Sequence, residues 1–214
     1  VQFSNGSTLN PAVLELRSGV TTSGPESAFD LSPADTLILR GTDGIPDIVS
    51  AGSGMWTIPN FVVAGTDSVI DAGGTIFTGS VFVRSGILAM GIGGSGATIT
   101  DSLVVTGTGV FAIAATEAAV TVNRDVRFAG ASTADHLGSG ATLSVGGNFR
   151  QEGDPQAFAP DLGFSVSANG GASQSFSFAN PGAGQSYLET FTAYNSVLLA
   201  SDASNFMTGA VIPV

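Results

Sequence analysis

The sequence contains no cysteine, so neither a disulfide bridge nor a thiolate metal site can stabilise the fold. It also contains no lysine, and its six arginines stand against seventeen acidic residues, which gives a net charge of -11. Such a charge opposes binding to nucleic acid phosphates or to an anionic membrane surface. Because no apolar run approaches the ~18 residues that a membrane helix needs, we predict neither nucleic acid binding nor membrane insertion.

Groups for catalysis are equally scarce. The only histidine, His136, lies in the stretch STADHLGSG, so a Ser/His/Asp arrangement would depend on a single loop residue. No serine stands in a GxSxG motif, and neither a Walker A motif nor a strand-to-helix GxGxxG motif is present. We interpret His136 as a solvated loop residue and predict that the chain is not an enzyme.

The chain is rich instead in glycine, small polar residues and valine. Of its 214 residues, 43% are hydrophobic, 30 are glycine and only 11% of the chain is charged. The length and the hydrophobic fraction are sufficient for one substantial core, and the composition favours short strands joined by turns. We therefore predict an all-β protein.

A loose repeat runs through the sequence. VNRDVRFAG at 122–130 is followed 23 residues later by VGGNFRQEG at 145–153, with Arg and Gly at matching places. Apolar residues that begin a short strand recur in nine units, at intervals of 20 to 27 residues: Leu14, Leu37, Phe61, Val81, Leu103, Val126, Phe149, Phe176 and Val197. Another apolar residue follows two places later in every unit except the seventh, which has Gln151. A strand face has this period of two, and the Gly or Asn that comes next suits a corner.

This pattern predicts a single-domain parallel β-solenoid of about nine coils. Each coil contributes a short strand, turns at a glycine corner and stacks on the next coil at ~4.8 Å. The domain would span 1–214, with coils over about 12–201 and protruding loops at 18–35 and 152–163. By analogy, the coil length favours a right-handed solenoid. The alternative is an antiparallel β-sandwich, whose turn signals recur every ~8 to 12 residues.

The units resemble those of bacterial secreted and surface parallel β-helix proteins, in which degenerate coils punctuated by Gly and Asn stack into a right-handed helix. The resemblance extends from about Leu14 to Leu199 and carries over no catalytic residue. It implies an extracellular or cell-surface location and a binding or structural role. Because the sequence begins at Val1 rather than Met, we also expect a chain from which a signal peptide has been removed.

Four aspartates form a candidate metal site. Asp43 and Asp67 lie six residues after the strand starts of adjacent units, and Asp47 and Asp71 lie ten residues after them. Stacked coils would bring these carboxylates together, and Ca²⁺ favours such oxygen-rich sites. Alternatively, GTDGIPD and GTDSVID are turn sequences in which an Asp side chain caps its own backbone.

The outward side of the predicted strands carries both charged and apolar residues. Five of the six arginines fall at positions that face solvent: Arg17, Arg40, Arg84, Arg127 and Arg150. One position after the strand start, four consecutive units have an apolar residue: Ile38, Val62, Phe82 and Val104. Such a stripe indicates contact with another subunit, unless a segment of the same chain covers it or the register is misassigned. The apolar tail, with Val211, Ile212 and Val214, is assigned to the same assembly interface.

Three functions are compatible with this reading. The leading one is a non-catalytic extracellular structural protein that self-assembles into a filament, sheath or surface layer, since the open end of a solenoid can template another strand. The second is an adhesin or carbohydrate-binding module that uses aromatic or carboxylate-bearing loops along one side of the solenoid to bind surface glycans. Surface Tyr or Trp would support it, but the sequence has only Trp56, Tyr187 and Tyr194. The third is a polysaccharide lyase or hydrolase, which would need the four aspartates to converge beside a basic residue.

Overall fold

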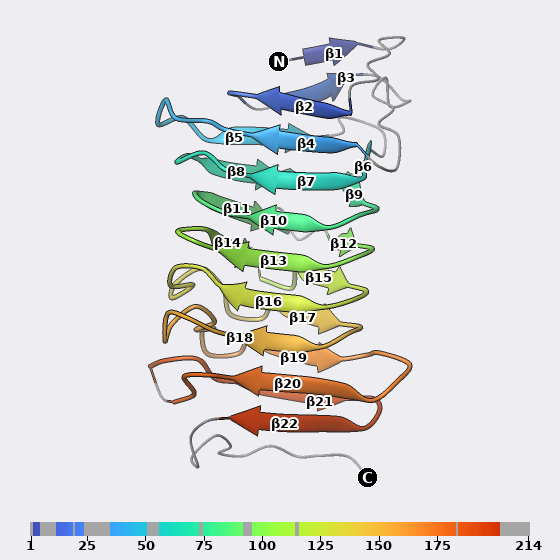
Figure 1. Ribbon diagram of the computed structural model, residues 1–214, viewed down its shortest axis with the longest axis vertical. Coiled ribbons are helices and arrows are strands. Elements are labelled where there is room, and N and C mark those ends of the chain that lie inside the picture. The colour runs from blue at the N-terminus through green and yellow to red at the C-terminus, as the bar shows by residue number, and fades with distance from the viewer. Residues whose placement is uncertain are drawn as a thin grey trace.

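A computed structural model describes residues 2–4, 12–18, 20–23, 35–50, 56–72, 75–91, 96–113, 116–182 and 184–201. The regular elements in these residues are β-strands, and they stack along one axis into a rod (Figure 1). All of the strand pairs are parallel. The predicted parallel β-solenoid is therefore confirmed, and the antiparallel sandwich is wrong.

Three sheets, here named A, B and C, run along the rod. Sheet A contains β1 (Gln2–Ser4), β3 (Val20–Ser23), β5 (Asp47–Ser50), β8 (Ser68–Asp71), β11 (Ile87–Met90) and β14 (Val110–Ile113). Sheet B contains β2 (Val13–Leu16), β4 (Thr36–Leu39), β7 (Asn60–Val63), β10 (Val81–Val83), β13 (Leu103–Thr106), β16 (Val126–Ala129), β18 (Phe149–Gln151), β20 (Gln174–Phe178) and β22 (Val197–Ser201). Sheet C contains β6 (Trp56–Ile58), β9 (Thr75–Phe77), β12 (Ala97–Ile99), β15 (Ala119–Val122), β17 (Thr142–Val145), β19 (Ser165–Ala168) and β21 (Thr190–Ala193).

The nine predicted strands are the nine strands of sheet B. After seven of them, the same turn of the solenoid goes on to form a strand of sheet C. In Figure 1 the strands of sheet B run to the left across the front, while the chain returns to the right behind them and descends from the N-terminus. This winding is right-handed, as the coil length predicted.

The register of sheet B follows the predicted strand starts in eight of nine units. Leu14 pairs with Leu37, Leu37 with Phe61, and the series continues to Phe176. The ninth assignment is wrong by two residues, because Phe176 pairs with Leu199 and Val197 pairs with Gln174. Both Val197 and Leu199 suit the inward side, since side chains of a strand alternate with a period of two, so local pattern does not choose between them.

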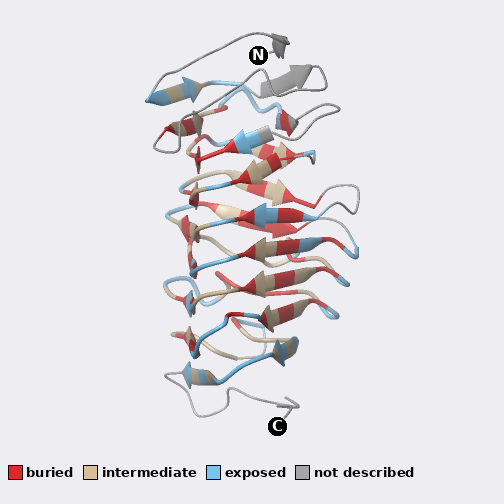
Figure 2. Ribbon diagram, turned by 90° about the vertical axis from the view of Figure 1, so that its right-hand side faces the viewer, coloured by how far each residue is buried: buried red, intermediate tan, exposed pale blue. Residues whose placement is uncertain are grey.

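The core fills the space between the sheets along the described part of the rod. In the middle turns, inward positions are buried and alternate with mostly half-buried or exposed outward positions, as Figure 2 shows, while the inward residues of β2, β21 and β22 are only partly buried. Aromatic rings occupy much of the lower half: Phe149 stacks on Phe176 with ring centroids 5.4 Å apart and an interplanar angle of 8°. Each buried Phe contributes about 1.5–3 kcal/mol relative to exposure.

Sheet A ends at β14, and irregular segments take its place in the later turns. Leu137 forms an isolated parallel bridge with Ile113, and Phe158 lies 4.9 Å from Phe149 between ring centroids. Phe158 is fully buried, so the segment 152–163, expected as a protruding loop, protrudes only in part. The correction has a simple cause: without a strand on this side, another large apolar side chain must close the core.

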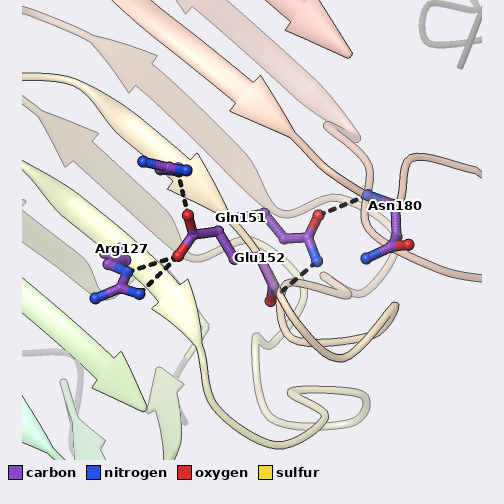
Figure 3. Close-up of polar contacts among 5 residues, drawn as sticks. Arg127, Gln151, Glu152 and Asn180 are labelled. Carbon is purple, nitrogen blue, oxygen red and sulfur yellow. Dashed lines mark hydrogen bonds and ion pairs between the residues drawn. The ribbon is translucent and has the colours of Figure 1, made fainter. Parts of the chain in front are cut away.

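Gln151, which takes an inward position that is apolar in the two neighbouring turns, is 1% exposed and hydrogen-bonded (Figure 3). Its amide nitrogen donates to the carbonyl oxygen of Asp154 at 2.9 Å, and its amide oxygen accepts from the backbone N–H of Asn180 at 3.0 Å. Asn180 in turn donates to the carbonyl of Gly153 at 3.0 Å. The buried amide therefore links two successive corners, and its hydrogen bonds offset the free energy lost when its polar groups leave water.

Candidate functional site

Asp43 and Asp67, two of the predicted metal ligands, cap a backbone turn. Asp67 accepts hydrogen bonds from the backbone N–H groups of Asp43 at 2.9 Å and Gly44 at 3.1 Å. Asp43 accepts one from the N–H of Ile45 at 3.0 Å. These contacts are those of the turn-capping alternative, with the addition that Asp67 caps the turn of the preceding coil rather than its own.

Asp47 and Asp71 are buried but do not stack on one another. Asp47 pairs with Val69, and Asp71 pairs with Val49. The expected alignment is wrong because the corner before Asp47 spans residues 40–46, whereas the next corner needs only 64–68 to reach Val69. The longer first corner displaces the following strand by two residues.

The carboxylates that do approach one another are those of Asp47 and Asp67. A side chain at Gly41 would clash with Oδ2 of both, so glycine is required where the two acids face this corner. Arg40, the nearest predicted basic residue, forms an ion pair with Glu15 at 3.1 Å. Within the described ranges, no three or more His, Cys, Asp or Glu side chains are grouped so that they could hold a metal ion. Calcium binding by Asp43, Asp47, Asp67 and Asp71 stays a prediction, which chelator-dependent thermal unfolding can test.

The predicted apolar stripe on sheet B is formed. Ile38, Val62, Phe82 and Val104 are successive partners in one outward row, which continues to Arg127. Val62 is only 4% exposed, however, and the other three are half-buried. The flanking Ile38 and Phe82 are larger than Val62 and lie one strand away on each side, which explains its burial. The guanidinium of Arg84 lies 5.9 Å from the centre of the Phe82 ring. Val211, Ile212 and Val214 lie outside the described residues.

Sheet A presents a second apolar surface, which sequence reasoning missed. Its outward residues, here called the sheet A face, are Ile48, Ile70, Ala89 and Ala112 in one row and Ser68, Ile87 and Val110 in the next. None of these seven residues is charged. Ile48 is 45% exposed, Ala112 is only 4% exposed, and the other five are half-buried. The signal was present in the sequence: ILAM at 87–90 and VFAI at 110–113 are continuous apolar runs, which indicate strands with two apolar sides.

Sheet C presents the opposite chemistry. Its outward residues, here called the sheet C face, are Thr57, Ile76, Thr98, Thr121, Ser144, Ser167 and Thr192 in one row and Ala119, Thr142, Ser165 and Thr190 in the other. Nine of these eleven residues are Ser or Thr, and none is charged. The hydroxyls of Ser144 and Ser167 are 2.8 Å apart and hydrogen-bonded. The motifs TLS, SVS and TFT carried this pattern in the sequence.

The three aromatic candidates for sugar binding have different environments. The phenol of Tyr187 is hydrogen-bonded to the carbonyl of Pro160, and burial raises its pKa, helped by the nearby charges of Glu189 and Asp161. Tyr194 is 70% exposed at the end of β21. Trp56 begins β6. Of the two tyrosines, Tyr194 is exposed and Tyr187 is half-buried.

The described residues contain no helix with the length and apolar character that crossing a bilayer requires. No protein-family model matches the chain, and no curated protein or solved structure is significantly similar to it.

Proposed function

We propose that this chain is a non-catalytic extracellular structural protein whose solenoids associate side by side through the sheet A face. The observation that carries the proposal is the chemistry of that face, where six apolar residues and one serine stand together without a charge. Contiguous apolar surface on a soluble protein commonly marks a contact with another molecule.

Electrostatics restricts the sides through which a second copy of the chain can associate. Two copies, each with a net charge of -11, repel one another over most orientations. The sheet A face is a side on which two copies can meet without bringing carboxylates together. Burying its side chains in the contact contributes about 25 cal/mol per Å² of apolar surface.

The stripe on sheet B offers a second contact on another side of the rod. Figure 1 places sheet B at the front and the sheet A strands behind it. A subunit that contacts one copy through the sheet A face and another through the stripe on sheet B can extend into a filament or layer, provided that the contacts do not close into a ring. The location outside the cell rests on the resemblance to secreted β-helix proteins.

A matched pair of substitutions tests the proposal. Ile70 and Ile76 belong to the same turn, are both outward and half-buried, and lie on sheets A and C respectively. We expect Ile70→Asp to reduce association in sedimentation velocity and to remove ordered assemblies from electron micrographs at micromolar concentration. Ile76→Asp introduces the same charge and removes the same apolar group, so it should associate like the wild type.

The far-ultraviolet circular dichroism of both variants should keep its β-sheet signal, which separates lost association from lost folding. A wild-type protein that stays monomeric at all concentrations tested would contradict the structural function. Equal assembly of Ile70→Asp and wild type would instead remove the sheet A face from the proposal and leave the sheet B stripe, tested in the same way by Phe82→Asp.

A further inference from the structure

We infer that the sheet C face binds a neutral, extended polysaccharide along the axis of the rod. The inference does not depend on association through the sheet A face, because the two surfaces belong to different sheets. It starts from the uncharged hydroxyl rows described above and from a third row beside them.

The third row consists of the residues that directly follow the strands. Their backbone N–H groups continue the ladder of sheet C: Thr100 donates to the carbonyl of Phe77 at 2.7 Å, Asn123 to Ile99 at 2.9 Å, and Asn169 to Val145 at 3.0 Å. The members of this row after β9, β12, β15, β17, β19 and β21 are Thr78, Thr100, Asn123, Gly146, Asn169 and Tyr194, whereas the residue after β6 is the buried Pro59. All of the row's members except Gly146 are exposed, so amide groups and a phenol extend the hydroxyl surface.

These groups form a regular lattice. Neighbouring strands repeat at ~4.8 Å along the rod, and alternate residues of one strand lie ~6–7 Å apart across it. The lattice is rigid because the inward residues of the same strands, such as Leu143 and Val166, are almost completely buried. A ligand that repeats at a similar distance can therefore repeat its contacts from turn to turn, and an extended chain of linked sugar rings is such a ligand.

The chemistry of the face selects an uncharged ligand. Hydroxyls and amides both donate and accept hydrogen bonds, which suits the hydroxyl groups of sugars. Without arginine at these positions the face has no partner for an anionic polysaccharide, and the net charge of -11 repels one. Individual contacts to water-exposed hydroxyls are weak, but many of them on one polymer add through a high effective concentration.

Tyr194 is the independent observation that points to a sugar. It is a large aromatic side chain, 70% exposed, at the end of the third row. Tyrosine combines an apolar ring with a polar tip and is enriched at binding surfaces for that reason. Its ring can cover the apolar side of a sugar ring while the neighbouring hydroxyls bind the edge. Ice is an alternative ligand for the hydroxyl rows, but an ice surface would gain nothing from this aromatic side chain.

The test is affinity electrophoresis in gels containing hydroxyethyl cellulose, with polygalacturonate as the anionic comparison, together with pull-down on microcrystalline cellulose. Ser167 and Ser177 give a matched pair, because both are outward, half-buried serines, on sheet C and sheet B respectively. We expect Ser167→Asp and Tyr194→Ala to weaken retardation by the neutral glucan roughly tenfold or more, which is about the effect of 1.4 kcal/mol. Ser177→Asp should bind like the wild type.

Failure of wild type to bind either neutral glucan would overturn the inference, and so would equal binding to polygalacturonate. An equal loss in Ser177→Asp would show a general charge effect and would also overturn it. If the protein inhibits ice recrystallisation and does not bind glucan, the sheet C face binds ice and the inference is overturned. The sedimentation behaviour of Ser167→Asp should match the wild type, so this test and that of self-association fail independently.

Discussion

The sheet A face and the sheet C face are two sides of one rod with the same interior and opposite exteriors. Leu88 on sheet A and Leu143 on sheet C are both completely buried, and both sheets stack in a regular parallel register. Outward, however, sheet A carries Ile, Ala and Val, and sheet C carries Thr and Ser. The fold favours apolar side chains at most inward positions of both sheets but makes no such demand outside. The outward composition is therefore free to differ between the two faces.

The strongest test of this comparison is to disturb the interior on both sides. Leu88→Ala and Leu143→Ala should each lower the free energy of unfolding by about 2–5 kcal/mol, since each leaves a cavity in a closely packed core. Urea unfolding followed by circular dichroism measures both. A large loss on one sheet with tolerance on the other would show that the two interiors are not equivalent.

A substitution of Gln151 tests whether a buried polar side chain stabilises the core through its hydrogen bonds as well as through its packing. Replacing Gln151 with Leu keeps a similar volume but leaves the Asn180 N–H and the Asp154 carbonyl without this partner. We expect a loss of about 1–3 kcal/mol in the free energy of unfolding, the usual cost of unsatisfied buried polar groups.

The control for Gln151 is Gln156→Leu. Gln156 also donates to a carbonyl, that of Gly184, at 2.9 Å, but this contact is exposed and water can replace it. Its loss should be smaller than that of Gln151→Leu. Equal losses in the two variants would mean that burial of the amide does not set its contribution.

The smallest effects on stability should come from exchanging the outward chemistries. Ile70→Thr and Thr121→Ile each place on one face the residue type of the other, and both types are good strand formers. We expect the free energy of unfolding to change by less than about 1 kcal/mol in each case. Sedimentation should show weaker association for Ile70→Thr, and affinity electrophoresis weaker glucan binding for Thr121→Ile. A large stability change in either variant would mean that the outward positions are constrained by the fold after all.

The sequence alone was sufficient for the parallel solenoid, for the nine strands of sheet B and for the outward row that includes Arg127 and Arg150. These features depend on local alternation and on a chain that returns to the same place after each turn, and both are visible as periods in the sequence. The same periodicity placed Ile38, Val62, Phe82 and Val104 in one row. This row could be predicted although the other two sheets were not.

The tertiary structure decided which side chains meet around the corners. Two extra residues in the corner at 40–46 moved Asp47 beside Val69, and the absence of a sheet A strand after β14 turned Phe158 inward. The sheet A and sheet C faces likewise exist only because separate turns align their strands. Corner length and side-chain packing set that alignment collectively, through contacts between residues 20 or more positions apart. A local pattern therefore predicts each strand but not the surface that the strands build together.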